Sequence, residues 1–87
     1  MPAPRIEMYM TSWCPYCEYA RRLLESKGVP FEAIDIEDEP ERRAEMIARS
    51  GRRTVPQVFI GGHHVGGSDD LHALDHAGGL DPLLKSA

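Results

Sequence analysis

The stretch that decides the fold is Thr11-Ser12-Trp13-Cys14-Pro15-Tyr16-Cys17, which stands between a short apolar run and an amphipathic segment. Cys14 and Cys17 are the only cysteines in the chain, and two residues separate them. A disulfide between them would close a very short loop and would therefore stabilise the fold little. We interpret the pair as a site of reversible redox chemistry or of metal binding, not as a structural crosslink.

The residues that follow Cys14 predict a helix from Pro15 to Lys27. Pro15 suits the first turn of a helix, and Gly28 suits the position after its end. Apolar and charged side chains alternate between two faces with helical spacing. The inward face is predicted to carry Cys17, Ala20, Leu23 and Leu24.

This helix predicts different chemistry for the two cysteines. Cys14 is expected at or next to the N-cap, where unpaired N–H groups and the positive end of the helix dipole favour a thiolate. Cys17 lies one turn further in and is expected to be buried and to keep its proton. Cys14 is therefore predicted to be the nucleophile, and Cys17 the thiol that resolves a mixed disulfide formed at Cys14.

The rest of the chain predicts strands and helices in the order β-α-β-α-β-β-α. Alternating or apolar runs predict strands at about 5–10, 29–35, 58–60 and 63–65, the last two joined by Gly61-Gly62 as a hairpin. The residues 38–41 and 66–70 are predicted to open two further helices, and residues 80–84 a last turn. The inward residues of these helices are predicted to be Ala44, Ile47, Ala48, Leu71, Leu74 and Ala77.

This order indicates an α/β fold with one sheet. A strand–helix–strand unit of this length gives a parallel pair with a right-handed crossover, and the hairpin adds antiparallel strands. The prediction is a four-stranded mixed sheet flanked by three or more helices.

Composition sets the class of protein. The chain has 87 residues, 41% of them hydrophobic and 28% charged, which is typical of one soluble domain spanning residues 1–87. The net charge of −4 gives no electrostatic reason to expect nucleic acid or a membrane as partner. No apolar stretch could span a bilayer, and no secretory signal is visible, so a cytoplasmic location is expected.

Three motifs in order resemble a dithiol glutaredoxin of the small bacterial type. They are Cys14-Pro15-Tyr16-Cys17, Thr54-Val55-Pro56 and Gly66-Gly67-Ser68-Asp69-Asp70-Leu71. The resemblance implies a thioredoxin-like fold and an enzyme that reduces protein disulfides and protein–glutathione mixed disulfides. Glutathione would be its co-substrate and glutathione reductase an indirect partner; we expect no bound cofactor, no metal and a monomer.

The residues of these motifs suit the chemistry of glutathione, which carries two carboxylates and an ammonium group. A helix start at 68–70 offers N–H groups to the γ-glutamyl carboxylate, and Asp69 or Asp70 can pair with the ammonium. Gly66 and Gly67 let a backbone approach closely. Arg52 can meet the glycine carboxylate, and Val55-Pro56 resembles the cis-proline element of the family. The predicted glutathione-binding residues are Tyr16, Arg52, Thr54, Val55, Pro56, Gly67, Ser68, Asp69 and Asp70.

Two other functions stay open at this point. Thr11 stands where the family usually has a lysine, and Trp13 before Cys14 is similar to thioredoxins, so thioredoxin reductase is an alternative electron donor. The other alternative is a dimer that binds an iron–sulfur cluster between two Cys14 residues and two glutathiones. Pro15 and the available Cys17 argue against the cluster.

The four histidines offer a weaker signal for metal binding. His63 and His64 are neighbours in a predicted strand, so their side chains point to opposite faces and cannot readily share one ion. His72 and His76 are four residues apart on one helix, with no third ligand in sight. We expect all four to be surface residues.

Overall fold

The structure is a computed structural model that describes residues 4–85. In chain order its elements are β1 (Ile6–Met10), α1 (Pro15–Ser26), β2 (Glu32–Asp35), α2 (Glu41–Ser50), β3 (Gln57–Ile60), β4 (His63–Gly66), α3 (Ser68–His76) and α4 (Leu80–Lys85). The predicted order is confirmed, and the last predicted turn is helix α4. β2 is shorter than predicted, because residues 29–31 form no strand.

The four strands form one mixed sheet in the order β2-β1-β3-β4. β1 runs parallel to β2 and antiparallel to β3, and β3 runs antiparallel to β4. Tyr9 near the end of β1 pairs with Gln57 at the start of β3, and Val58 pairs with Gly66 at the end of β4. The register therefore brings the loops 11–14, 51–56 and 66–68 together at one end of the strands.

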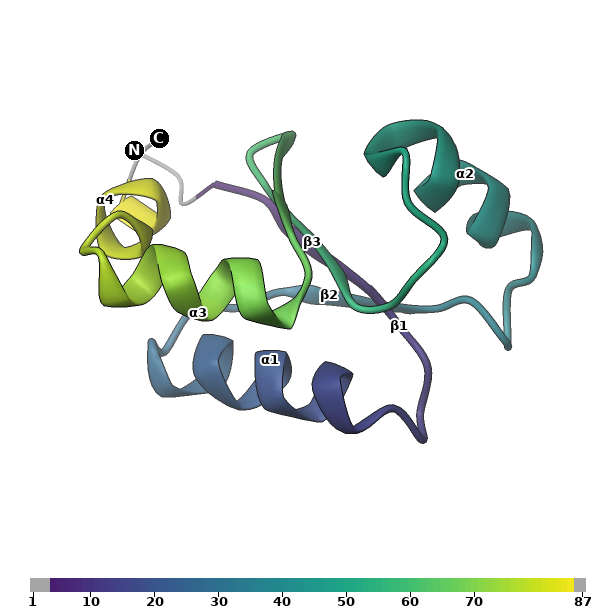
Figure 1. The fold of residues 1–87 in the computed structure, drawn as a ribbon, viewed down its shortest axis with the longest axis horizontal. Helices are drawn as coiled ribbons and strands as arrows, with labels where there is room; N and C mark the ends of the chain where they lie inside the picture. The colour runs from purple at the N-terminus through teal and green to yellow at the C-terminus, as the bar shows by residue number, and fades with distance from the viewer. Residues whose placement is uncertain (1–3, 86–87) are drawn as a thin grey trace.

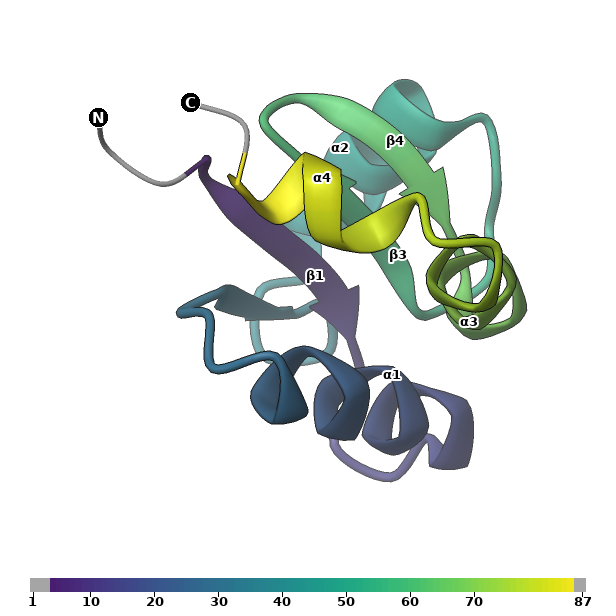
Figure 2. The same cartoon turned by 90° about the vertical axis from the view of Figure 1, so that its left-hand side faces the viewer.

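Helices cover both faces of the sheet (Figures 1 and 2). Helices α1, α3 and α4 pack on one face, while α2 lies on the other. Strand residues alternate between these layers, as period two requires. The buried core under α1, α3 and α4 contains Ile6, Met8, Ala20, Leu24, Val58, Ile60, Leu71, Leu80 and Leu84. The smaller core under α2 contains Tyr9, Ile34, Ile36, Met46 and Phe59.

The predicted inward face of α2 is correct for Ile47, which packs against the core, and wrong for the two alanines. Ala44 and Ala48 are exposed, and Met46 is the buried residue of this helix. The helix is turned so that Met46 and the long side chain of Arg49 cover the sheet. The Arg49 guanidinium lies 4.0 Å above the Phe59 ring, a cation–π contact that the alanines could not make.

Ala77 of the predicted inward set is exposed, because α3 ends at His76 and Ala77 is already its C-cap.

Within residues 4–85, no helix combines the length and the apolar character needed to cross a membrane.

Candidate active site

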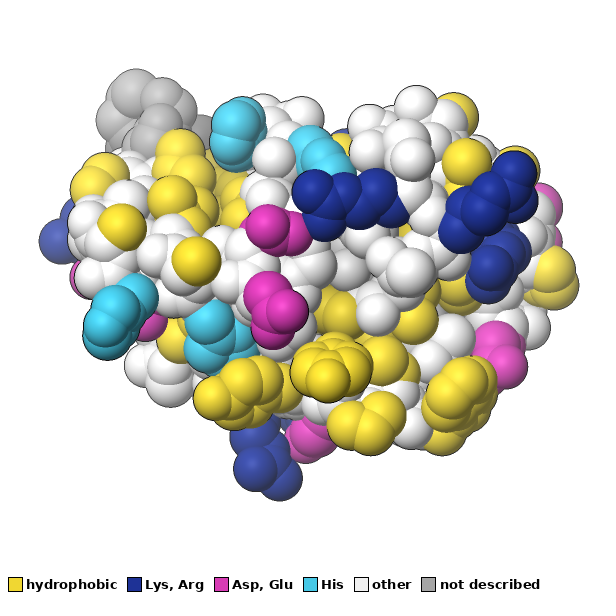
Figure 3. All heavy atoms as spheres, in the orientation of Figure 1, with side chains coloured by type: hydrophobic (Ala, Val, Ile, Leu, Met, Phe, Trp, Pro, Cys, Tyr) yellow, Lys and Arg dark blue, Asp and Glu magenta, His cyan; other side chains and the backbone are white. Residues whose placement is uncertain are grey.

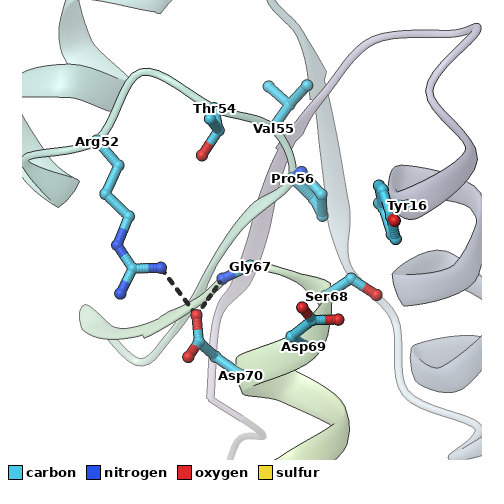
Figure 4. A pocket seen from close by; sticks show the side chains of 9 residues that line it. All are labelled: Tyr16, Arg52, Thr54, Val55, Pro56, Gly67, Ser68, Asp69 and Asp70. Atoms are coloured by element: carbon cyan, nitrogen blue, oxygen red, sulfur yellow. Dashed lines mark hydrogen bonds and ion pairs between the residues drawn. The ribbon is translucent and has the colours of Figure 1, made fainter.

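The three loops at this end of the strands enclose a cavity of about 220 Å³ (Figure 4). Tyr16 and Arg52 lie on opposite sides of it, and the residues from Gly67 to Asp70 lie below Val55 and Pro56 in this view. Its lining residues are Tyr16, Arg52, Thr54, Val55, Pro56, Gly67, Ser68, Asp69 and Asp70. These are the residues that the sequence predicts for glutathione binding, and the structure brings all of them together.

Cys14 is the N-cap of α1, and its sulfur contacts Val55, one of the residues that line this cavity. Its sulfur accepts a hydrogen bond from the Cys17 N–H at 3.2 Å, and its thiol donates to the Val55 carbonyl at 3.8 Å. Because Val55 lines the cavity, this contact fixes the sulfur beside it. Cys14 is partly exposed, as predicted, and can be reached by a disulfide of another molecule.

Cys17 is buried beneath the first turn of α1, with an exposed fraction of 2%. Burial, followed by the hydrogen bond with Cys14, raises the pKa of Cys17 to about 12. The two cysteines therefore differ in access as predicted: one thiol meets the solvent, and the other keeps its proton inside the protein.

Asp70 caps the N-terminus of α3. Its carboxylate accepts a hydrogen bond from the Gly67 N–H at 3.0 Å and pairs with Arg52 at 2.8 Å (Figure 4). The Arg52 guanidinium, followed by the Gly67 N–H, lowers the pKa of Asp70. Sequence reasoning missed this capping role, although an acidic residue at the third position of a helix is its usual signal.

Gly66 leaves room for the capping carboxylate of Asp70. It has φ +123°, and a Cβ on it would lie 2.7 Å from Asp70 Cγ. The expected role of Gly66 toward a ligand stays a prediction. Gly66 is also absent from the cavity lining, whereas Gly67 belongs to it.

The start of α3 keeps polar groups free for a ligand. The first hydrogen bond within this region is donated by the Leu71 N–H to the Gly67 carbonyl at 2.9 Å, so the N–H groups of residues 68–70 precede the helical ladder. The Asp69 carboxylate makes no hydrogen bond or ion pair with any residue in the range 4–85. An anion and a cation could thus be bound side by side here.

The loop before β3 contains one predicted and one unpredicted feature. The Val55–Pro56 peptide bond is cis, as the family resemblance implies, and the next residue, Gln57, is fully buried, which was not predicted. The Gln57 amide donates to the Thr54 carbonyl at 3.0 Å and lies 2.7 Å from His64 Nε2. The sequence signal for this buried amide was the glutamine that precedes the apolar residues 58–60.

Two histidines are less exposed than expected. His64 is half-buried and packs against the Phe59 ring with centroids 4.9 Å apart. His72 is also half-buried and stacks on Tyr19 at 4.1 Å. His63 and His76 are exposed, as expected. Among residues 4–85, no group of three or more His, Cys, Asp or Glu side chains is arranged to hold a metal ion.

Thr11 touches the cysteine motif through its backbone. Its carbonyl accepts a hydrogen bond from the Cys14 N–H at 3.4 Å. Its side chain is buried, and Oγ1 has no hydrogen-bond partner among residues 4–85.

The fold and the paired thiols define a class: thiol–disulfide oxidoreductases built on a thioredoxin-like sheet, with the reactive cysteine at a helix N-terminus. Comparison with known proteins narrows this class. The glutaredoxin family model matches residues 6–65. Glutaredoxin 3 of Escherichia coli strain K12 is 58% identical over 80 residues, which cover 92% of this chain and 96% of that protein.

Solved structures agree with this match. The solution structure of glutaredoxin from Brucella melitensis superposes with a TM-score of 0.84 at 52% identity, covering 97% of this chain and 91% of the other. The crystal structure of a buckwheat glutaredoxin–glutathione complex gives a TM-score of 0.85 at 31% identity, covering 93% and 76%. The chain belongs to the glutaredoxin family. It has the predicted thioredoxin-like fold and is a glutathione-dependent thiol–disulfide oxidoreductase.

Proposed function

We propose that this glutaredoxin uses Cys14 as nucleophile and Cys17 as resolving thiol, and that the cavity beside Cys14 holds the glutathione part of the substrate. The observation that carries the proposal is the contact of Cys14 Sγ with Val55, since it joins the exposed sulfur to the cavity. The nine lining residues would be the glutathione-binding residues. The whole chain would act as one domain.

In the first step the Cys14 thiolate attacks the glutathione sulfur of a mixed disulfide. A new S–S bond forms between Cys14 and glutathione, the old S–S bond breaks, and the protein leaves as a thiolate that takes a proton from water. A second glutathione, as thiolate, then attacks the sulfur of the bound glutathione. Oxidised glutathione leaves and the Cys14 thiolate is restored.

A disulfide within a substrate protein needs Cys17. After Cys14 has formed a mixed disulfide with that protein, Cys17 loses its proton and attacks Cys14, which releases the substrate thiolate. Both the hydrogen bond with Cys14 and the charge of its thiolate raise the Cys17 pKa. Both are removed once Cys14 is part of a mixed disulfide, so Cys17 becomes easier to ionise when it is needed. Two glutathiones then reduce the Cys14–Cys17 disulfide.

The start of α3 supports a specific orientation of glutathione. The N–H groups of residues 68–70 would hold the γ-glutamyl carboxylate, because they face the ligand without helical partners. Asp69 would pair with the neighbouring ammonium group, since Asp70 already binds Gly67 and Arg52. Arg52, half-exposed on the far side of the cavity, would attract the glycine carboxylate.

A protein substrate would lie on the aromatic surface beside Cys14, which we define as Trp13, Tyr16 and Tyr19. These side chains are 71%, 63% and 58% exposed. Figure 3 shows hydrophobic side chains gathered along the lower side of the view, where Figure 1 places α1. A groove lined by Pro15, Tyr16, Glu18, Tyr19 and Arg22 continues the surface along α1. Exposed apolar surface of this kind is typical of protein-binding sites.

The test is a coupled assay with glutathione, glutathione reductase and a small glutathionylated disulfide. Cys14→Ser should be inactive on every substrate. Cys17→Ser should keep its activity on the glutathionylated substrate, where glutathione resolves the intermediate, and lose it on a protein disulfide. Full activity of Cys14→Ser would overturn the assigned roles.

The alternatives are outcomes of the same experiment. Reduction by thioredoxin reductase in place of glutathione and its reductase would assign a different electron donor. A coloured, dimeric protein after isolation would indicate the cluster-binding alternative, whereas we expect a colourless monomer.

A further inference from the structure

The loop 52–55 is held by side chains rather than by a backbone ladder. The carbonyl oxygen of each of these residues lies within hydrogen-bond distance of a side chain, two of them near in sequence and two from other elements. The pairs are Ser50 Oγ to Arg52 O at 3.2 Å, Arg43 Nη2 to Arg53 O at 3.3 Å, Gln57 Nε2 to Thr54 O at 3.0 Å, and Cys14 Sγ to Val55 O at 3.8 Å. The position of this wall of the cavity therefore depends on those side chains.

Gln57 is the fully buried member of this set. Its amide nitrogen lies 3.0 Å from the Thr54 carbonyl and 3.3 Å from the Thr54 hydroxyl, while its amide oxygen faces His64 Nε2 at 2.7 Å. Both ends of the amide are thus engaged. A buried amide without partners would be costly, so these contacts hold the side chain in one orientation.

The chemistry of the three groups fixes the direction of each hydrogen bond. The Thr54 carbonyl can only accept, so the NH₂ group of Gln57 must face it. The Gln57 oxygen then accepts from His64 Nε2, which must carry a hydrogen. His64 is held in turn by its contact with the Phe59 ring. A chain of contacts therefore runs from β4 through Gln57 to Thr54, next to the residue that binds Cys14.

We propose that Gln57 and His64 are positioning residues for the glutathione-binding wall of the cavity. His64 orients the Gln57 amide, and Gln57 holds the Thr54 carbonyl, so that the Thr54–Val55 peptide presents its remaining groups to glutathione. This proposal rests on the proposed function, because it assumes that the loop contacts glutathione. Neither residue lines the cavity, so both act through the loop.

The test compares Gln57→Met and His64→Phe with the control His63→Phe. Gln57→Met keeps the side-chain length and removes the amide, and His64→Phe keeps an aromatic ring against Phe59 and removes the donor. His63 is the exposed neighbour on the same strand. In the coupled assay, both test variants should raise the KM for the glutathionylated substrate about fivefold to tenfold, as expected for one lost buried hydrogen bond. The value of kcat should stay within about twofold, since the cysteines are unchanged.

A spectroscopic measurement supplements the kinetics. The hydrogen bond to the Thr54 carbonyl polarises the peptide group that contains the Val55 N–H. In ¹H–¹⁵N spectra the Val55 amide signal should therefore shift in both test variants and stay in place in His63→Phe. A variant that is merely less stable but still folded would keep the KM unchanged. Circular dichroism measures the folded fraction of each variant, so the two effects can be told apart.

The outcomes separate this proposal from the proposed function. If Arg52→Ala raises the KM but Gln57→Met and His64→Phe match the control, the positioning pair is refuted and the cavity remains the glutathione site. If Arg52→Ala also leaves the KM unchanged, the cavity assignment itself fails. If Gln57→Met does not fold, His64→Phe decides, because His64 lies on the edge strand β4 and is only half-buried.

Discussion

The buried thiol of Cys17 leads to a quantitative prediction about its reactivity. The perturbation is Cys14→Ser, which leaves Cys17 as the only thiol of the chain. Burial is the largest cause of the raised pKa, and it stays in this variant. The variant should therefore show how strongly the fold protects the resolving cysteine.

The pKa of about 12 in the unsubstituted chain gives the upper limit of the effect, because the part that Cys14 contributes is lost in this variant. At pH 7 such a thiol is ionised to ~10⁻⁵, whereas a free cysteine with a pKa of ~8.5 is ionised to ~3%. The more basic thiolate is intrinsically more nucleophilic, which offsets about half of this difference on a logarithmic scale. Alkylation of the folded variant should thus be slower than alkylation of the same chain unfolded by a factor of up to about fifty. Poor access to a side chain that is 2% exposed will slow it further.

The assay is the second-order rate of reaction with iodoacetamide, measured for the variant in buffer and in concentrated urea. In buffer the rate should rise about tenfold for each pH unit and show no plateau up to about pH 10, because ionisation stays incomplete. A folded rate within tenfold of the unfolded rate, or a plateau near pH 8, would refute the reasoning.

Three further predictions concern the start of α3 and the hairpin. Asp70→Asn should lower the free energy of unfolding in urea by about 1 kcal/mol through the lost cap charge, whereas Asp69→Asn should leave it unchanged and raise the KM for a glutathionylated substrate. Gly66→Ala should cost about 1–3 kcal/mol in the same titration, because its φ is +123° and the new Cβ meets Asp70. Burial, followed by Arg52, lowers the pKa of His64 below 6.5, so the unfolded chain binds this proton first as the pH falls. Stability should therefore drop as the pH falls through about 6.5, and His64→Phe should lack that part of the drop; equal pH profiles would contradict it.

The sequence predicted the features that depend on neighbouring residues. Pro15 and Gly28 define the two ends of α1, so the place of Cys14 at the N-cap and of Cys17 one turn inside follow from local rules. The cavity lining was also predicted, because the motifs around Pro56 and Gly67 resemble those of the glutaredoxin family.

The features that depend on contacts between distant residues could not be predicted in the same way. The rotation of α2 is determined by Arg49 packing on Phe59 from another element, and alanines at helical spacing gave no hint of it. The ion pair of Asp70 with Arg52 joins two separate loops, so the capping position of Asp70 alone does not predict it. The contact of Gln57 with His64 depends on the register shift between Val58 and Phe59, which the predicted hairpin turn does not specify.

The turn at Gly61 and Gly62 has a practical consequence for experiments on this protein. β3 leads away from the Val55–Pro56 loop, so this turn lies at the opposite end of the sheet, where the Gly61 N–H donates to the Arg5 carbonyl at 2.7 Å. Both glycines are exposed and have positive φ. A residue inserted between them would offer an attachment point for a dye or a surface tether that leaves the cysteines unobstructed. Electron transfer to immobilised or labelled protein could then be followed without disturbing the end of the molecule that performs it.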